Sequence, residues 1–258
     1  LKPNYPEAFY NLGNALSEKG DLKEASNSYK KAIKHRPNYS SAYKNLSLIE
    51  LLSGNYEDGW VHHEWRWKTK DAKRPHAIPQ TQQWQGEVLQ QGDKLLVISE
   101  QGLGDTLQFM RYIPYLRDQG IDVSFCAQSK LHSLIKVSNI DPSPLTAEQA
   151  NSVTEQPWIP LLSLPRYLGV SPSNPIISKP YITTKDSLIK KWKTILDKEK
   201  RPIIGINWQG NPKMEKTYQG RSIPLEEFST LTENNTVKIL SLQKGFGSEQ
   251  LETCSFKE

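Results

Sequence analysis

The chain has 258 residues, 36% of them hydrophobic and 24% charged, and its formal net charge is +5. This length is enough for one large domain or two modest domains with a sizeable core. No apolar run approaches the ~18 residues of a membrane-spanning helix, so the sequence excludes a helical membrane span over this stretch.

The net charge and the positions of the cysteines indicate which binding partners and which cellular compartment to expect. A positive balance suits an anionic ligand such as a nucleotide, and it leaves nucleic acid or an acidic membrane surface open. The basic residues are spread along predicted helices, so we interpret most of them as solvated faces and expect no nucleic-acid partner. Cys126 and Cys254 lie far apart and form neither a metal-binding spacing nor a disulfide framework, which favours a reduced, cytoplasmic setting.

The first part of the chain repeats itself. Pro3-Asn4-Tyr5 recurs 34 residues later as Pro37-Asn38-Tyr39. Small residues are expected where paired helices cross closely, and aromatic residues are expected to fill the seam between them. The first unit follows the pattern of tetratricopeptide helix pairs at Phe9, Leu12, Gly13, Leu16, Gly20, Ala25, Tyr29, Ala32 and Pro37.

The second unit departs from this pattern. Ser47 stands in the place of Gly13, and Glu50 stands in the place of Leu16. A degenerate last repeat is expected where a repeat array meets another domain. We therefore expect residues 1–70 to form tetratricopeptide helical repeats that begin before Leu1 or dock on the domain that follows.

A segment rich in tryptophan and histidine comes next. His62, His63 and Glu64 are residue types that bind metals, but neighbouring residues of a helix point about 100° apart, so we favour a polar seam over a metal site. Residues 71–93 contain prolines and a glutamine-rich stretch and are predicted to be a linker, which Trp84 attaches to a surface. We also predict one aromatic cluster from Trp60, Trp65, Trp67 and Trp84.

From Lys94 the hydrophobic pattern changes to that of buried strands and short helices. We predict a strand over 95–99, a helix over 106–117, a strand over 123–127 and a short helix over 129–137. The Gly102-Leu103-Gly104 turn between the first strand and its helix predicts an anion site, because free N–H groups and the positive helix end meet there. This order of elements is typical of a parallel doubly wound sheet over 94–182.

A second α/β pattern then begins. We predict an amphipathic helix over 185–200, within a connection of residues 183–201, with Leu188, Trp192, Ile195 and Leu196 on one face. Strands are predicted over 202–208 and 237–242, and a helix is predicted to start within 222–228 with Pro224 at its first position. Residues 202–258 therefore predict the start of a second Rossmann-like half that continues beyond Glu258.

The motifs of this chain, taken in order, resemble those of tetratricopeptide-containing glycosyltransferases similar to the heptosyltransferase (family 9) group and, more distantly, to O-linked N-acetylglucosamine transferases. The motifs are YEDGW…EWRW (56–67), EQGLGDTLQFMRY (100–112), IGINWQGNP (204–212) and RSIPLEEF (221–228). The resemblance implies helical repeats followed by two Rossmann-like halves of the GT-B type. It also implies an inverting transfer from a nucleotide sugar, without a bound metal or cofactor, to a glycan or protein acceptor.

The resemblance places the Gly-Asp pair of the family on Gly104-Asp105, and it implies that Asp105 is the general base. A carboxylate at the carboxyl end of a strand lies where open α/β sheets bind ligands, and it could take the proton of an acceptor hydroxyl. The alternative is that Asp105 only caps the helix, with Gln108 completing a capping box. Gln101, Gln108 and Gly102 are expected on the same acceptor side.

On the donor side, the resemblance places the basic residue of the family on Arg221. A guanidinium binds diphosphate through bidentate contacts, and Lys216 and Asn211 are further candidates for phosphate binding. The alternative is a surface cation at a helix start. The family often has lysine at this position and an aromatic residue where this chain has Ile223. Since the family's donor-binding segment is expected beyond Glu258, we expect this stretch alone to be inactive.

Other functions compete with the transferase. Repeat arrays supply concave surfaces, so a non-catalytic scaffold that binds a partner protein on its repeats is the main alternative. A dinucleotide-binding oxidoreductase is disfavoured because Leu107 stands where the third glycine of that motif belongs. The sequence contains no Gly-x-Ser-x-Gly, P-loop or His-Glu-x-x-His motif, so hydrolase, NTPase and zinc-protease functions lack support.

Overall fold

The computed structural model describes residues 5–176, 179–212 and 222–256. The chain divides into two compact units, Leu1–Thr184 and Lys185–Glu258. In the described part of the chain, every helix is too short or too polar to span a lipid bilayer.

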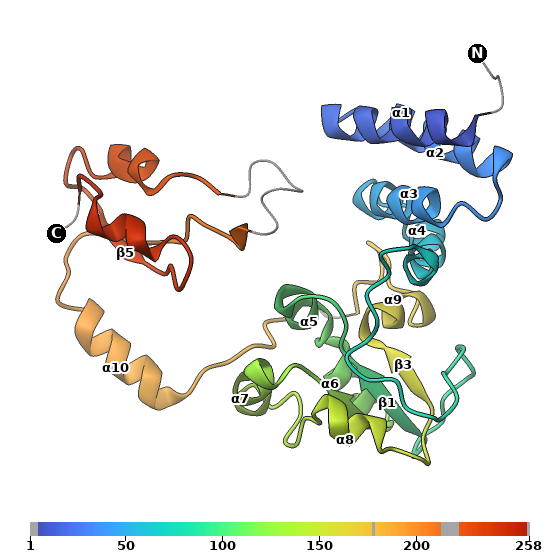
Figure 1. Ribbon diagram of the computed structural model, residues 1–258. Helices are drawn as coiled ribbons and strands as arrows, with labels where there is room; N and C mark the ends of the chain where they lie inside the picture. The colour runs from blue at the N-terminus through green and yellow to red at the C-terminus, as the bar shows by residue number, and fades with distance from the viewer. Residues whose placement is uncertain (1–4, 177–178, 213–221, 257–258) are drawn as a thin grey trace. The chain divides into compact units, whose positions relative to one another are not determined.

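The first unit starts with packed helices, drawn in blue and cyan in Figure 1. The first of them has Pro6 at its start, where a missing N–H costs no helical hydrogen bond, and it ends at Gly20 with a φ of +86°. The side chain of Asp21 caps the second helix by accepting a hydrogen bond from the N–H of Glu24. The helices are α1 (Pro6–Lys19), α2 (Leu22–His35), α3 (Ser40–Leu52), α4 (Tyr56–His63) and the 3-10 helix η1 (Glu64–Lys68).

Close packing explains the small residue in the middle of α1. A Cβ added to Gly13 would lie only 2.5 Å from Cε1 of Tyr29. Tyr29 is buried and its hydroxyl donates a 2.8 Å hydrogen bond to Asn14, so the ring is held in place. Tyr29 joins Ala25, Leu46 and Ile49 in a core shared by α1, α2 and α3.

A small parallel sheet follows the helices in the order β2-β1-β3. The four apolar residues of β1, from Leu95 to Ile98, have no exposed surface. They alternate between two clusters on opposite faces of the sheet, as expected for a parallel sheet that is covered on both sides. The strands are β1 (Lys94–Ile98), β2 (Asp122–Cys126) and β3 (Trp158–Pro160).

The short helical segments around this sheet are α5 (Leu103–Phe109), α6 (Tyr112–Asp118), α7 (His132–Val137), α8 (Ala147–Asn151), α9 (Leu164–Tyr167), η2 (Ser129–Leu131) and η3 (Leu161–Ser163). The prediction of one continuous helix over 106–117 is wrong, because α5 ends at Phe109 and α6 begins at Tyr112. Pro114 explains the break, since it has no N–H to donate to the carbonyl of Met110 and its ring collides with that carbonyl in a regular helix.

Part of the predicted linker is integrated into the sheet region. The N–H of Trp84 donates a 2.8 Å hydrogen bond to the carbonyl of Trp158 in β3, and Trp84 is buried in the main core. Gly86 has a φ of +99° and lies against the ring of Tyr167, where a Cβ would come within 2.3 Å. Residues 82–86 thus lie beside the sheet through backbone pairing and aromatic packing.

The prediction of a single tryptophan cluster is wrong. Trp65 stacks on Tyr43 of α3 at 4.1 Å between ring centroids, whereas Trp60 meets the edge of Phe109 at 6.1 Å. Trp84 contacts Tyr167. The rings are separated because each one joins a different pair of elements. Trp67 lies under the guanidinium of Arg66.

The second unit contains a pair of parallel strands. Its core joins Ile206, Trp208 and Leu225. Pro224 precedes the helix instead of opening it, and the first helical N–H, that of Leu225, donates to the side chain of Gln250. The elements are α10 (Asp186–Leu196), β4 (Ile203–Ile206), η4 (Leu225–Leu231), β5 (Lys238–Ser241) and η5 (Ser248–Glu252).

Candidate functional site

A cavity of about 460 Å³ lies in the first unit, next to the turn that follows β1. One wall consists of the repeat helices α3 and α4, including Leu48, Leu51 and Trp60. The other wall consists of α5, α6 and the loop over 170–175. The cavity is therefore built jointly by the helical repeats and the carboxyl end of the sheet.

Three predicted acceptor-side residues line this cavity. They are Gln101, Asp105 and Gln108. Gly102 and Gly104 are exposed beside them, and a Cβ added to Gly104 would meet no atom within 4 Å. Packing in the folded chain therefore does not require glycine at position 104.

The capping alternative, which made Asp105 the N-cap of α5, is wrong. Gly102 occupies that position, and its N–H donates a 2.9 Å hydrogen bond to Oδ2 of Asp105 three residues later. The chain's own carboxylate thus accepts the hydrogen bond of one N–H group in the turn that the sequence predicted to bind an anion. One carboxylate oxygen is used in this way, while the residue still lines the cavity.

The strain of the turn falls on Gln101 and not on the glycines. Gln101 has a φ of +61°, in the left-handed region that residues with a Cβ rarely adopt. Gly102 has an extended backbone with a φ of −88°. A non-glycine residue held in the left-handed region costs about 1–2 kcal/mol, and such strained residues cluster at functional sites.

The predicted donor-side residues belong to the second unit. Asn211 is exposed there. Arg221 and Lys216 lie outside the described residues. The structure therefore gives no geometry for the predicted phosphate contacts of these two side chains.

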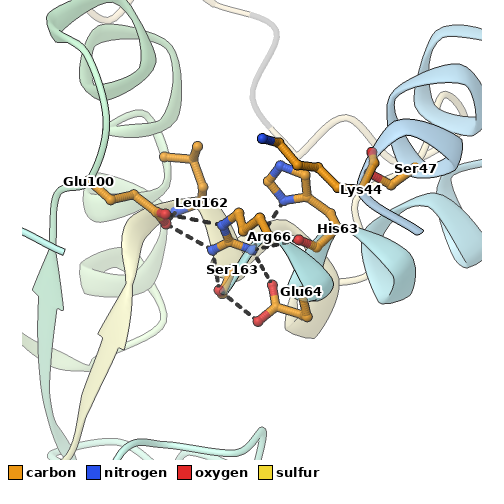
Figure 2. Close-up of polar contacts among 8 residues, drawn as sticks. All are labelled: Lys44, Ser47, His63, Glu64, Arg66, Glu100, Leu162 and Ser163. Atoms are coloured by element: carbon orange, nitrogen blue, oxygen red, sulfur yellow. Dashed lines mark hydrogen bonds and ion pairs between the residues drawn. The ribbon is translucent and has the colours of Figure 1, made fainter. Parts of the chain in front are cut away.

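A buried ion pair between Arg66 and Glu100 holds the residue that precedes the turn after β1 (Figure 2). Glu100, which directly precedes Gln101, has no exposed surface, and Arg66 of η1 is 5% exposed. Nε of Arg66 donates to Oε2 of Glu100 at 3.1 Å, and Nη2 donates to Oε1 at 2.9 Å. This bidentate pair joins the end of the helical repeats to the carboxyl end of β1.

The same guanidinium also contacts the segment after β3. Nη2 of Arg66 donates to Oγ of Ser163 at 2.8 Å, and Ser163 donates in turn to Glu64 at 3.0 Å. The N–H of Leu162 donates to Oε1 of Glu100 at 3.0 Å. Figure 2 shows Arg66 between these groups, which come from three separate parts of the chain.

Burial and the charge of the partner shift the pKa values of Glu100 and Arg66 in opposite directions. Burial raises the pKa of the Glu100 carboxyl, while Arg66 and the N–H of Leu162 oppose this rise. Burial alone would lower the pKa of the Arg66 guanidinium, but Glu100 and Glu64 outweigh it and raise the pKa. The bidentate geometry is that of a guanidinium–carboxylate pair, so loss of either partner would leave the other charge buried and unpaired.

His63 is held neutral beside Arg66. Its Nδ1 lies 3.2 Å from Nη1 of Arg66, and since a guanidinium can only donate, this nitrogen must be the unprotonated acceptor. Burial, together with the charges of Arg66 and Lys44, lowers the pKa of His63 to about 3.

The histidine-rich segment does not bring its side chains to one point. Nδ1 of His62 lies 2.7 Å from the buried carboxylate of Glu50, whereas His63 and Glu64 face Arg66. Within the described ranges, no group of three or more His, Cys, Asp or Glu residues could hold a metal ion. The segment forms a polar seam between the repeats and the sheet.

The pairing of Glu100 with Arg66 is not among the features predicted from the sequence. A signal was present, since Glu100 comes two residues after the apolar run Leu95–Ile98, and a carboxylate that the chain buries there needs a partner. The partner could not be chosen from the sequence, because Arg66 lies 34 positions away across the predicted linker.

Comparison with known proteins agrees with the helical part of this architecture. Residues 6–39, which include α1 and α2, match the family model described as tetratricopeptide repeat. No curated protein matches the chain. The fold and the match define a protein with a tetratricopeptide repeat over residues 6–39 followed by a small parallel sheet, and the repeat supports a role in protein interaction.

Proposed function

We propose that this chain contributes the acceptor side of a glycosyltransferase that moves a sugar from a nucleotide-sugar donor to an acceptor hydroxyl, with inversion and without a metal. The observation that carries the proposal is the position of Asp105 in the wall of the cavity, at the carboxyl end of β1. The order of sequence motifs over 56–228 supports the same class of reaction.

In the proposed reaction, Asp105 accepts the proton of the acceptor hydroxyl while that oxygen attacks the anomeric carbon. The bond from the anomeric carbon to the nucleoside diphosphate breaks, and the leaving group takes the electron pair. Arg221, Lys216 and Asn211 are the proposed residues that compensate the charge of the leaving diphosphate. The new glycosidic bond forms on the opposite face of the sugar, which gives inversion.

The walls of the cavity suit an acceptor that has both apolar and polar parts. Tyr56, Trp60, Phe109 and Tyr112 supply aromatic surface. The indole N–H of Trp60 donates a 3.1 Å hydrogen bond to the carbonyl of Val170, so this ring is held in one orientation. Fixed aromatic walls with a few polar groups are typical of binding sites for small ligands.

The test replaces Asp105 by asparagine, whose side-chain oxygen can still accept the hydrogen bond from Gly102. Transfer from a panel of UDP-, GDP- and ADP-sugars is measured with the full-length protein. We expect turnover to fall by about 10²–10⁴-fold while donor affinity is retained. Unchanged turnover would overturn the assignment of the base.

Asp93→Asn is the matched control. Oδ2 of Asp93 accepts a 2.7 Å hydrogen bond from the N–H of Gln90, three residues earlier, as Asp105 does from Gly102. Asp93 lies at the amino end of β1, outside the residues that line the cavity. Equal losses in the two variants would indicate a purely structural role for Asp105.

A non-catalytic interaction protein is the second candidate. Two observations favour it, namely the tetratricopeptide match over 6–39 and the hydrogen bond that the Asp105 carboxylate accepts from the N–H of Gly102, the N-cap residue of α5. Absence of transfer and of donor binding in the full-length wild-type protein, combined with partner binding that survives Asp105→Asn, would favour the scaffold.

A further inference from the structure

The helix α10 presents an apolar face that its own unit leaves about half exposed. None of its residues is buried in the described part of the chain. Leu188, Ile189, Trp192 and Ile195 are between 44% and 50% exposed. An amphipathic helix of this kind normally buries such a face against another surface.

The charges of α10 are arranged around this face. Since an α-helix turns about 100° per residue, Leu188, Ile189, Trp192 and Ile195 fall within an arc of roughly 120°. Lys191 and Lys193 are the charged residues nearest to the arc, one on each side, about 40° from its edges. Asp186 lies about 20° beyond Lys193, and Asp197 and Lys190 lie farther round the helix. The charged residue nearest to the apolar face is therefore a lysine on each of its borders, and α10 contains three lysines and one aspartate.

We propose that α10 binds the surface of an anionic membrane, with its axis in the plane of the interface. Trp192 and the aliphatic side chains would enter the boundary between headgroups and acyl chains, and the flanking lysines would extend toward lipid phosphates. Charge complementarity selects this partner, because an anionic bilayer supplies negative charge on both sides of an inserted helix. The proposal does not depend on the proposed transferase.

The test measures binding of the full chain to vesicles of phosphatidylcholine alone and to vesicles with about one third phosphatidylserine. We expect binding to the anionic vesicles to be at least about tenfold stronger. Trp192→Glu should abolish it, because a carboxylate would enter the apolar boundary. Circular dichroism confirms that the variant is folded.

Matched lysine variants test the geometry. Lys193→Gln, at the border of the face, should weaken binding by about fivefold, since each lysine near the surface contributes about that factor. Lys190→Gln removes the same charge from the far side of the helix, where screening is stronger, and should have little effect. Equal effects of the two variants would overturn the proposed orientation.

Two further results would overturn the proposal. One is equal binding to neutral and anionic vesicles, or no binding to either. The other is measured without vesicles. The difference between the fluorescence emission of the wild type and that of Trp192→Phe gives the emission of Trp192. A blue-shifted Trp192 protected from acrylamide would show that another part of the chain, or a second copy, already covers this face.

Discussion

The two units contain the same local pattern, a short apolar strand in a parallel sheet followed by a polar turn. In the first unit, Leu95–Ile98 of β1 are completely buried. In the second, Ile204 and Gly205 of β4 are exposed, and only Ile206 is buried. The difference comes from the surroundings, since β1 lies between two strands with apolar clusters on both faces, whereas β4 has one paired strand within the described residues.

The turns after the two strands are held by different chemistry. After β1, the charge of Glu100 is paired with Arg66 in a buried site. After β4, the N–H groups of Trp208 and Gln209 both donate to the side-chain oxygen of Gln243, at 3.1 and 3.0 Å. A buried charged junction should therefore respond strongly to loss of a partner or to pH, and a partly exposed neutral junction should respond weakly.

The largest effect is expected for Arg66→Met, which leaves Glu100 buried without its partner. We expect a loss of about 4 kcal/mol in the free energy of unfolding of the first unit, measured by denaturant titration. Arg66→Met/Glu100→Met should recover most of it, because apolar residues of similar volume can replace a buried pair. Arg201→Met removes the partly exposed pair of Arg201 with Glu199 in the second unit and should cost less than about 1 kcal/mol. Equal losses for Arg66→Met and Arg201→Met would show that burial does not set the contribution of these ion pairs.

Thiol labelling should separate the two units by reactivity. Cys126 ends β2 and is buried, and burial raises its pKa to about 12. Cys254 of the second unit is only partly buried. At mildly alkaline pH we expect Cys254 to react with a disulfide reagent at least about a hundredfold faster than Cys126, whose thiolate is scarce. Mass spectrometry of the labelled peptides assigns the sites, and comparable rates would show that the sheet of the first unit opens readily.

The pH dependence of stability should come from the first unit through His63. Its folded pKa of about 3 lies below the value of 6.5 for an unperturbed histidine, so the unfolded chain binds the additional proton between these values. This contribution is complete above pH ~6.5 and is lost as the pH falls toward 3. We expect a loss of about 2 kcal/mol between pH 7 and pH 5, which His63→Gln should remove. Parallel curves of unfolding free energy against pH for the wild type and His63→Gln would contradict the role of His63.

The sequence predicted the elements whose signal is local. The repeat over 6–39 and the apolar run before Gly102 were recognisable because their residues lie close together in the chain. The break between α5 and α6 was missed although Pro114 was visible, because the apolar spacing over 106–117 outweighed a proline that the structure places in the first turn of a new helix.

The candidate site was predictable on one side only. Gln101, Asp105 and Gln108 could be proposed because they follow β1 directly. The opposite wall, from α3 and α4, depends on how the repeats pack on the sheet, and no local pattern encodes this. The pairing of Glu100 with Arg66 depends on the same packing.

The position of Arg66 has a practical consequence for dissecting this protein. A cut between the repeats and the sheet, at the boundary that the composition of residues 71–93 suggests, would separate Arg66 from Glu100. Each fragment would then contain an ionisable group that is buried in the intact chain, and the sheet fragment would also lose one wall of its cavity. Fragments of this protein should therefore be divided between its two compact units, near Thr184, and not at the end of the repeats.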